Sequence, residues 1–75
     1  MSITDLIEQF TIQGAYHIKV WKNHPYMCET LARGSDFECE CFDIDGRVLE
    51  RNITYMYVMD GVLNIELEEP EEEVE

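Results

Sequence analysis

The amino-acid sequence predicts one α+β domain, with an antiparallel sheet of about four to five strands and one N-terminal helix packed on a face. Three observations predict this class. A short amphipathic segment opens the chain, runs of alternating apolar and polar residues follow it, and an Asp-Gly pair joins the last two runs. A chain of 75 residues has room for one domain. We assign that domain to residues 1–68 and expect residues 69–75 to form an acidic, disordered tail.

The helix is expected in residues 2–10, SITDLIEQF. Ser2 or Thr4 can cap its N-terminus, and Gly14 can provide a left-handed exit after it. Its apolar residues share helical spacing and are Ile3, Leu6, Ile7 and Phe10. They form one face, enough to lie across a sheet.

The next three runs alternate as strands do. In residues 15–23 the apolar side consists of Tyr16, Ile18 and Val20, and the opposite side of His17, Lys19 and Trp21. Turn-forming residues at 23–25 then lead into residues 26–34, which we expect to complete a hairpin. Residues 35–42, SDFECECF, predict a third strand with Phe37, Cys39 and Cys41 on one side.

Residues 43–51, DIDGRVLER, make a weak strand, and we favour a connecting turn or short helix. Asp45-Gly46 is an alternative hairpin turn. In the helical alternative, Asp43 caps a turn that inserts Ile44, Val48 and Leu49 into the core.

The hairpin at residues 53–68 is the clearest pattern in the chain. Asp60-Gly61 suits a two-residue type I′ turn, which requires positive φ at both positions. This turn sets Met59 opposite Val62, and alternation fixes the remaining pairs. The resulting core face reads Thr54, Met56, Val58, Leu63, Ile65 and Leu67. Tyr55, Tyr57 and Asn64 point to the other side.

The formal charge of −12 is unevenly distributed. Residues 66–75 hold seven glutamates and no base, which leaves −5 on the rest of the chain. The five scattered Lys and Arg residues form no basic patch, so we expect neither direct nucleic-acid binding nor binding to an anionic membrane. The N-terminal residues lack the basic start and the long apolar run of a signal peptide. No apolar run is long enough to span a membrane. A cytoplasmic location with reduced cysteines is therefore expected.

Cysteines and histidines offer the main candidates for metal or catalytic chemistry: Cys28, Cys39, Cys41, His17 and His24. Zinc sites are usually built from paired Cys-x-x-Cys or His-x-x-x-His knuckles on turns, and this chain has neither. Cysteines that alternate with Phe37 are more simply core residues. We therefore expect no enzyme activity, no catalytic residue and no metal or other cofactor, with a small metal-binding protein as the alternative.

Two groups of residues are candidates for an interaction surface. One is the acidic run Asp36, Glu38, Glu40, Asp43 and Asp45. The other comprises Trp21, Tyr55, Tyr57 and Asn64, on the side of the sheet away from the predicted helix. The acids have an alternative role as a solvated strand edge that resists aggregation. Alternatively, residues 42–51 fold back and cover the aromatic side chains.

Three segments, FTIQGAYHIKVW, GSDFECE and ITYMYVMDGVLNIELE, resemble a family of small uncharacterised acidic proteins of Firmicutes phages and conjugative or mobile elements. The resemblance implies the setting of an accessory protein and carries over no site residue. With the acidity, it leads us to expect a protein-interaction module, in sharper form a stoichiometric inhibitor or DNA mimic. Its expected target is a host-defence or nucleic-acid-binding protein with a basic surface. A homodimeric structural protein is a further alternative.

Overall fold

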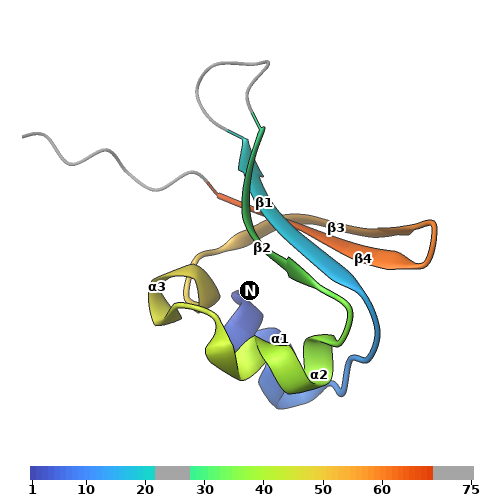
Figure 1. Ribbon diagram of the computed structural model, residues 1–75. Coiled ribbons are helices and arrows are strands. Elements are labelled where there is room, and N and C mark those ends of the chain that lie inside the picture. Colours follow the sequence, from blue (N-terminus) through green and yellow to red (C-terminus); the bar gives the residue numbers. More distant parts are fainter. Residues whose placement is uncertain (22–27, 69–75) are drawn as a thin grey trace, which may run out of the picture.

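A four-stranded sheet with helices on one side forms the fold (Figure 1). The computed structural model describes residues 1–21 and 28–68. In chain order the elements are α1 (Ile3–Gln9), β1 (Tyr16–Trp21), β2 (Cys28–Gly34), α2 (Phe37–Glu40), the 3-10 helix η1 (Cys41–Asp43), α3 (Gly46–Leu49), β3 (Ile53–Met59) and β4 (Val62–Leu67). The α+β class, the N-terminal helix and the C-terminal hairpin are confirmed. The turn expected at residues 23–25 and the tail expected at 69–75 lie outside the described residues.

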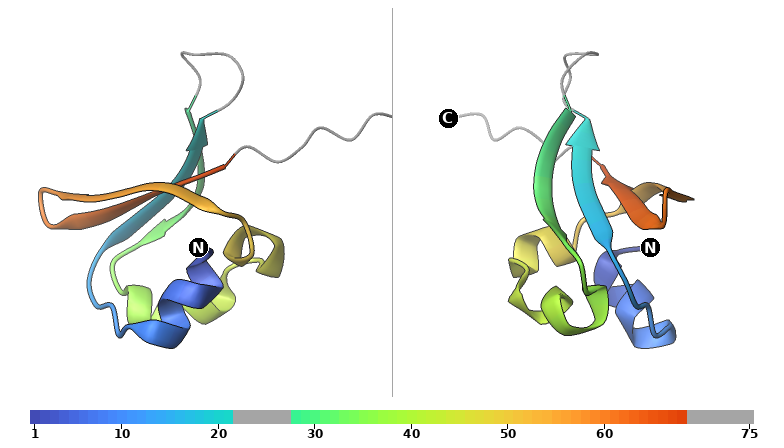
Figure 2. Two further views of the ribbon diagram at one scale, coloured as in Figure 1. Left: turned by 180° about the vertical axis from the view of Figure 1, so that it is seen from behind. Right: turned by 45° about the vertical axis from the view of Figure 1, so that its right-hand side comes forward.

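The sheet is mixed, so the prediction of a purely antiparallel sheet was wrong. Its strand order is β2-β1-β4-β3, and the two central strands, β1 and β4, run parallel. Each hairpin is antiparallel, as expected. The two hairpins meet through β1 and β4 because the chain leaves β2, passes through the helical layer and returns to the far edge as β3 (Figure 2). Local turn signals fix the pairing within a hairpin but not this long-range orientation.

α1 begins where the sequence placed it. The side-chain oxygen of Ser2 accepts a hydrogen bond from the Asp5 amide at 3.2 Å, and the Asp5 carboxylate accepts one from the Ser2 amide at 3.1 Å. This reciprocal capping box satisfies two backbone donors at the helix start. The helix ends at Gln9, before Phe10, and Gly14 adopts φ 101° in the connection to β1. Phe10 is exposed, so the buried helix face is narrower than the spacing predicted.

Residues 35–42 form α2 and the start of η1, and the predicted third strand was wrong. The Asp36 carboxylate caps the turn by accepting from the Cys39 amide at 3.3 Å. Phe37 and Cys41 lie four residues apart, so one helical face buries both, whereas Cys39 points to solvent. A strand would have put all three on one side. The Asp36 carboxylate, by capping the backbone, instead favours the helical conformation.

Residues 43–51 contain the short helix α3, in agreement with the favoured reading. Its cap is Asp45, whose carboxylate accepts from the Arg47 amide at 2.8 Å, and not Asp43. Ile44, Val48 and Leu49 pack against the core, as that reading expected. They do so from the helical side of the sheet, and α3 meets α1 there, where the Thr4 hydroxyl donates to the Leu49 carbonyl at 3.3 Å.

The core lies between the helices and one side of the sheet. Its buried apolar residues are Ile3, Leu6, Tyr16, Ile18, Val20, Phe37, Cys41, Ile65 and Leu67. Edge-to-face packing of Tyr16 on Phe37, with ring centroids 5.2 Å apart, joins β1 to α2. Burial of these side chains is the main source of stability in so small a domain.

The C-terminal hairpin confirms the predicted register from Tyr55–Glu66 to Met59–Val62. Asp60 and Gly61 have φ values of 55° and 77°, as a type I′ turn requires. Three residues of the predicted core face are nevertheless exposed. Met56 and Val58 lie on the part of β3 that extends beyond the helices, and Thr54 falls at a register shift, where its hydroxyl donates to the Glu66 carbonyl at 3.1 Å.

Two glycines give a matched test of the turn. A Cβ added at Gly61 or at Gly46 meets no atom within 4 Å, so the two sites differ in backbone conformation and not in space. Gly61→Ala should lower the free energy of unfolding by about 1–2 kcal/mol because its φ is left-handed. Gly46→Ala, in the first turn of α3, should be neutral or stabilising by up to about 1 kcal/mol. Urea unfolding measures both, and equal effects would contradict the turn assignment.

Thiol labelling tests the correction at residues 35–42. Cys28 and Cys39 are exposed and Cys41 is buried. In native protein at mildly alkaline pH, maleimide should therefore modify Cys28 and Cys39 first and Cys41 only after unfolding. Peptide mass spectrometry reads the site of modification, and labelling in urea is the control in which all three react. If Cys39 and Cys41 were both protected from maleimide in native protein, the result would support the predicted strand over the helix.

Candidate functional site

One side of the sheet faces away from the helices, and we call it the open face. Its side chains come from alternate positions of the strands: His17, Lys19 and Trp21 of β1, Tyr55, Tyr57 and Met59 of β3, and Val62, Asn64 and Glu66 of β4. The helices all lie on the other side in the three views (Figures 1 and 2). Within residues 1–21 and 28–68, nothing packs over the open face. The alternative in which residues 42–51 cover the tyrosines was therefore wrong.

The aromatic rings of the open face are held by their neighbours. The indole N–H of Trp21 donates to a carboxylate oxygen of Glu66 at 3.0 Å. The Lys19 ammonium lies 5.5 Å from the centre of the Tyr57 ring, within reach of a cation–π interaction. Tyr57 in turn meets Tyr55 edge to face, with ring centroids 6.0 Å apart. These contacts reach across three strands and limit the rotamers that the rings can adopt.

The four predicted contact residues on this face differ in accessibility. Trp21 and Tyr55 are exposed and Tyr57 is partly buried. Asn64 is buried, and its side-chain Nδ2 donates to the Val62 carbonyl at 3.0 Å. Asn64 therefore supports the sheet, and the aromatic rings are the groups on this face that a partner can contact.

His17 lies on the open face toward β2. Its Nε2 is 2.8 Å from the Thr30 hydroxyl oxygen. Burial lowers the pKa of the His17 imidazole below its usual 6.5, and the positive charges of Lys19 and Arg33 lower it further. The pKa of Lys19 is raised, chiefly by its hydrogen bond to Tyr57. The lowered pKa favours the neutral form of His17, so Lys19 and Arg33 supply the positive charge around it.

The acidic run lies in the helical layer, away from the open face. Asp36 and Asp45 cap α2 and α3, and the Glu38 carboxylate accepts a hydrogen bond from the side-chain Nε2 of Gln13 at 3.0 Å. Glu40 lies beside Tyr16, whose pKa is raised by burial and then by hydrogen bonding to that carboxylate. Asp43 is exposed in η1. The structure therefore does not bring the acidic run and the aromatic residues together into one surface.

The cysteine and histidine candidates do not converge. Within the described ranges, no group of three or more Cys, His, Asp or Glu side chains is close enough to hold a metal ion, and His24 lies outside those ranges. The pKa of the Cys39 thiol is raised by its hydrogen bond to Asp36, and that of Cys41 is raised by burial. Both shifts favour the thiol over the thiolate, the form that acts as nucleophile or metal ligand.

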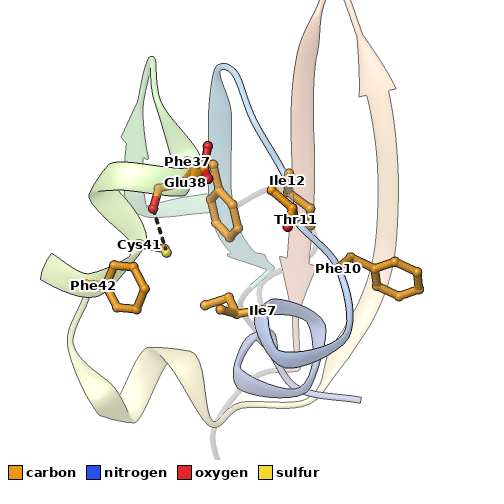
Figure 3. A pocket seen from close by; sticks show the side chains of 8 residues that line it. All are labelled: Ile7, Phe10, Thr11, Ile12, Phe37, Glu38, Cys41 and Phe42. Atoms are coloured by element: carbon orange, nitrogen blue, oxygen red, sulfur yellow. Dashed lines mark hydrogen bonds between the residues drawn. The ribbon is translucent and has the colours of Figure 1, made fainter.

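A small pocket opens between α1 and the α2–η1 segment (Figure 3). Its volume is about 210 Å³, and Ile7, Ile12, Phe37 and Phe42 provide its apolar lining. The Cys41 thiol donates to the Glu38 carbonyl at 3.6 Å at one side, and the Phe10 ring points away from the opening. This volume is below the roughly 300 Å³ of the smallest ligand sites and suits one side chain. Sequence reasoning missed this pocket, because Phe10 was assigned to the buried face of the helix and residues 35–42, which include Phe42, were predicted as a strand.

Comparisons with protein families, with curated proteins and with solved structures found no match for this chain. The resemblance to small acidic proteins of mobile elements therefore stays a prediction. In the part of the chain that the structure describes, no helix has the length and apolar character needed to cross a membrane.

The electrostatics of the open face can be tested at His17. Lys19→Gln removes a positive charge that lowers the His17 pKa, so the pKa should move upward toward 6.5. Arg47→Gln removes an exposed charge on α3 and should leave it unchanged. Titration of the His17 ring by NMR, assigned with His17→Gln, measures the shift.

The lowered pKa of His17 also determines how its contribution to stability depends on pH. Because the folded pKa lies below 6.5, the unfolded chain binds the proton more readily as the solution becomes acidic. The contribution of His17 to stability is therefore fully present above pH 6.5 and is lost as pH falls through the folded pKa. A folded pKa at or above 6.5 would contradict this description of the face.

Proposed function

We propose that this protein is a non-enzymatic binding protein that engages another protein through the open face of its sheet. One observation carries the proposal: Trp21 and Tyr55 are exposed, together with the partly buried Tyr57, on a sheet face that no described element covers. A β-sheet of a small domain normally buries its aromatic side chains or places polar ones outward. Aromatic residues outside the core call for a second surface to cover them.

The arrangement of these rings suits protein recognition. Tyr and Trp bury a large area with few rotatable bonds and keep a polar atom at the rim, and they dominate binding energy in many interfaces. Here the Trp21–Glu66 hydrogen bond and the Lys19–Tyr57 contact restrict the rings before a partner arrives. Less conformational entropy is then lost on binding.

The charge of the chain favours a partner with a basic surface. A net charge of −12 raises the rate of encounter with such a partner and weakens encounter with nucleic acid or other acidic surfaces. In its sharper form the proposal is a stoichiometric inhibitor that occupies the nucleic-acid-binding surface of a host-defence protein, in the manner of a DNA mimic. The expected setting in a mobile element supports this form. The metal-binding alternative has no grouping of described residues in its favour.

The tyrosines of the open face provide the test. Tyr55→Ser with Tyr57→Ser should weaken binding to a purified partner by at least about 100-fold, because the loss of two aromatic contacts typically costs a few kcal/mol. Calorimetry measures the affinity and the stoichiometry, and the partner is first captured from a bacterial host with the tagged wild-type chain. Binding should also weaken as salt is added, since the charges of the two proteins are opposite.

The matched control is Phe10→Ser with Phe42→Ser. It removes two aromatic rings that are also exposed, but from the helical layer instead of the open face. This variant should bind as the wild type does. The reverse pattern, with binding lost in the phenylalanine variant and kept in the tyrosine variant, would refute the open face and transfer the function to the pocket between α1 and η1. Circular dichroism checks that each variant is folded.

A further inference from the structure

β3 is a strand at the edge of the sheet with the composition of a central strand. Its sequence, ITYMYVM, is uncharged, whereas β1 contains Lys19, β2 contains Glu29 and Arg33, and β4 contains Glu66. Natural sheets usually protect their edges with charges, prolines or short strands. β3 has seven residues and none of these charges or prolines. A strand that is apolar on both sides is typical of the interior of a sheet.

The main chain of β3 has unused hydrogen-bonding groups along this edge. The turn bonds Met59 to Val62, and antiparallel pairs alternate, so Val58 and Met56 are in the pairs that exchange no hydrogen bond with β4. The Leu63 amide, opposite Val58, accordingly donates away from β3, to the Ala15 carbonyl at 3.0 Å. The N–H and C=O groups of Met56 and Val58 therefore point outward from the sheet.

The N-terminal residues cover the beginning of this edge and leave the rest bare. The Ile53 amide donates to the Met1 carbonyl at 2.7 Å, and Ser2 forms an antiparallel bridge with Asn52. The chain then turns into α1 and departs from the edge. Among the described residues, no backbone pairs with the outer edge of β3, on the side away from β4, from residue 54 to residue 59.

We propose that β3 pairs antiparallel with β3 of a second copy of this chain, which joins two four-stranded sheets into one of eight strands. Antiparallel pairing of a strand with itself has two-fold symmetry, so the same groups of Met56 and Val58 donate and accept in both copies. The tyrosines of the two strands meet on one side of the new sheet, and Met56 and Val58 meet on the other. The second copy binds at the β3 edge, so it is distinct from the partner proposed for the open face.

The uncharged β3 edge permits a second copy to approach despite the acidity of the whole chain. Two chains of −12 repel each other over most of their surfaces, and the β3 edge is where close approach sets no two charged side chains opposite each other. After pairing, the outer edges of the joined sheet are the two β2 strands. These carry Glu29 and Arg33 and include a register shift against β1, so growth beyond the dimer is disfavoured.

The exposed area fits a reversible dimer. Tyr55 is 65% exposed, Met56 45%, Val58 69% and Met59 57%. With about 200 Å² for a fully exposed large side chain, these four expose on the order of 450 Å² per chain. Two copies thus offer at most about 900 Å² from these residues, below the lower limit of about 1,200 Å² for stable interfaces. An interface of this size belongs to the weak, transient class, and we expect a dissociation constant in the micromolar range or weaker.

Sedimentation velocity of the wild-type chain and of Val58→Lys tests the pairing. The 8.9 kDa wild-type chain should convert from monomer to dimer between about 1 µM and 1 mM, a range that spans a micromolar dissociation constant. Dimerisation should strengthen with added salt because repulsion is screened. Val58→Lys should remain a monomer, since a lysine on the edge opposes pairing and its position is already exposed to solvent.

Two controls accompany this variant. Val58→Thr keeps a β-branched, uncharged side chain and should dimerise as the wild type does. Cys28→Lys introduces the same charge on the opposite edge strand, β2, and should also dimerise. Hydrogen exchange gives a second reading, in which the Met56 and Val58 amides become protected as concentration rises.

Three outcomes would overturn the proposal. If the wild-type chain stayed monomeric over the whole concentration range, β3 would not pair with a second copy, and a strand of a different protein would be the candidate for this edge. A Val58→Lys variant that dimerises normally would place the interface elsewhere. A dimer in which the Met56 and Val58 amides stay unprotected would have formed through the open face. The monomeric Val58→Lys variant retains Trp21, Tyr55 and Tyr57, so its binding to a purified partner tests the proposed function of the open face. Its failure to dimerise tests the edge pairing, and the two proposals can therefore fail independently.

Discussion

The parallel pairing of β1 with β4 is the contact on which the rest of the structure depends. It is where the N-terminal hairpin and the C-terminal hairpin become one sheet. Ile18 and Ile65 face each other there and are both fully buried. α1 and α2 have an apolar surface to cover because these strands meet, since Ile3, Leu6 and Phe37 pack over the same side. Without that junction, each hairpin would be too small to bury a core.

The same junction gives the sheet two sides of different character. The helices take the side with Tyr16, Ile18 and Ile65, and this leaves the alternate residues of the same strands on the open face. Lys19 and Glu66 are neighbours across the parallel pair, and each holds an aromatic ring, Tyr57 and Trp21 respectively. The proposed recognition surface is thus a direct product of strand order.

Local chemistry made some of the fold predictable from sequence. Asp60-Gly61 accepts the positive φ of its turn, and alternation then determined every pair from Tyr55 to Met59. The orientation of β1 against β4 was not predictable, because Ile18 and Ile65 would be buried by either orientation. Residues 35–42 were ambiguous because Phe37 and Cys41 are four residues apart. That spacing gives a common face in a strand and in a helix alike, and the cap at Asp36 decides between them.

The candidate site was predictable to a similar extent. The side of the sheet that Trp21, Tyr55 and Tyr57 occupy follows from alternation alone. The burial of Asn64 does not, because it depends on the long-range pairing of β1 with β4, which places Asn64 on a central strand. The separation of the acidic run from the rings follows from the helical conformation at Asp36, which the alternating pattern concealed.

The mixed strand order also determines how the chain reaches its folded state. Each hairpin joins residues close in sequence and can form within about 1–10 µs. The central pair joins His17 to Asn64, which are 47 residues apart in a chain of 75, and its loop-closure entropy is paid before helices can pack over it. Until then both hairpins expose unpaired central strands. The slow step of folding is therefore the meeting of two preformed halves, and its rate is sensitive to changes at β1 and β4 far more than to changes in either turn.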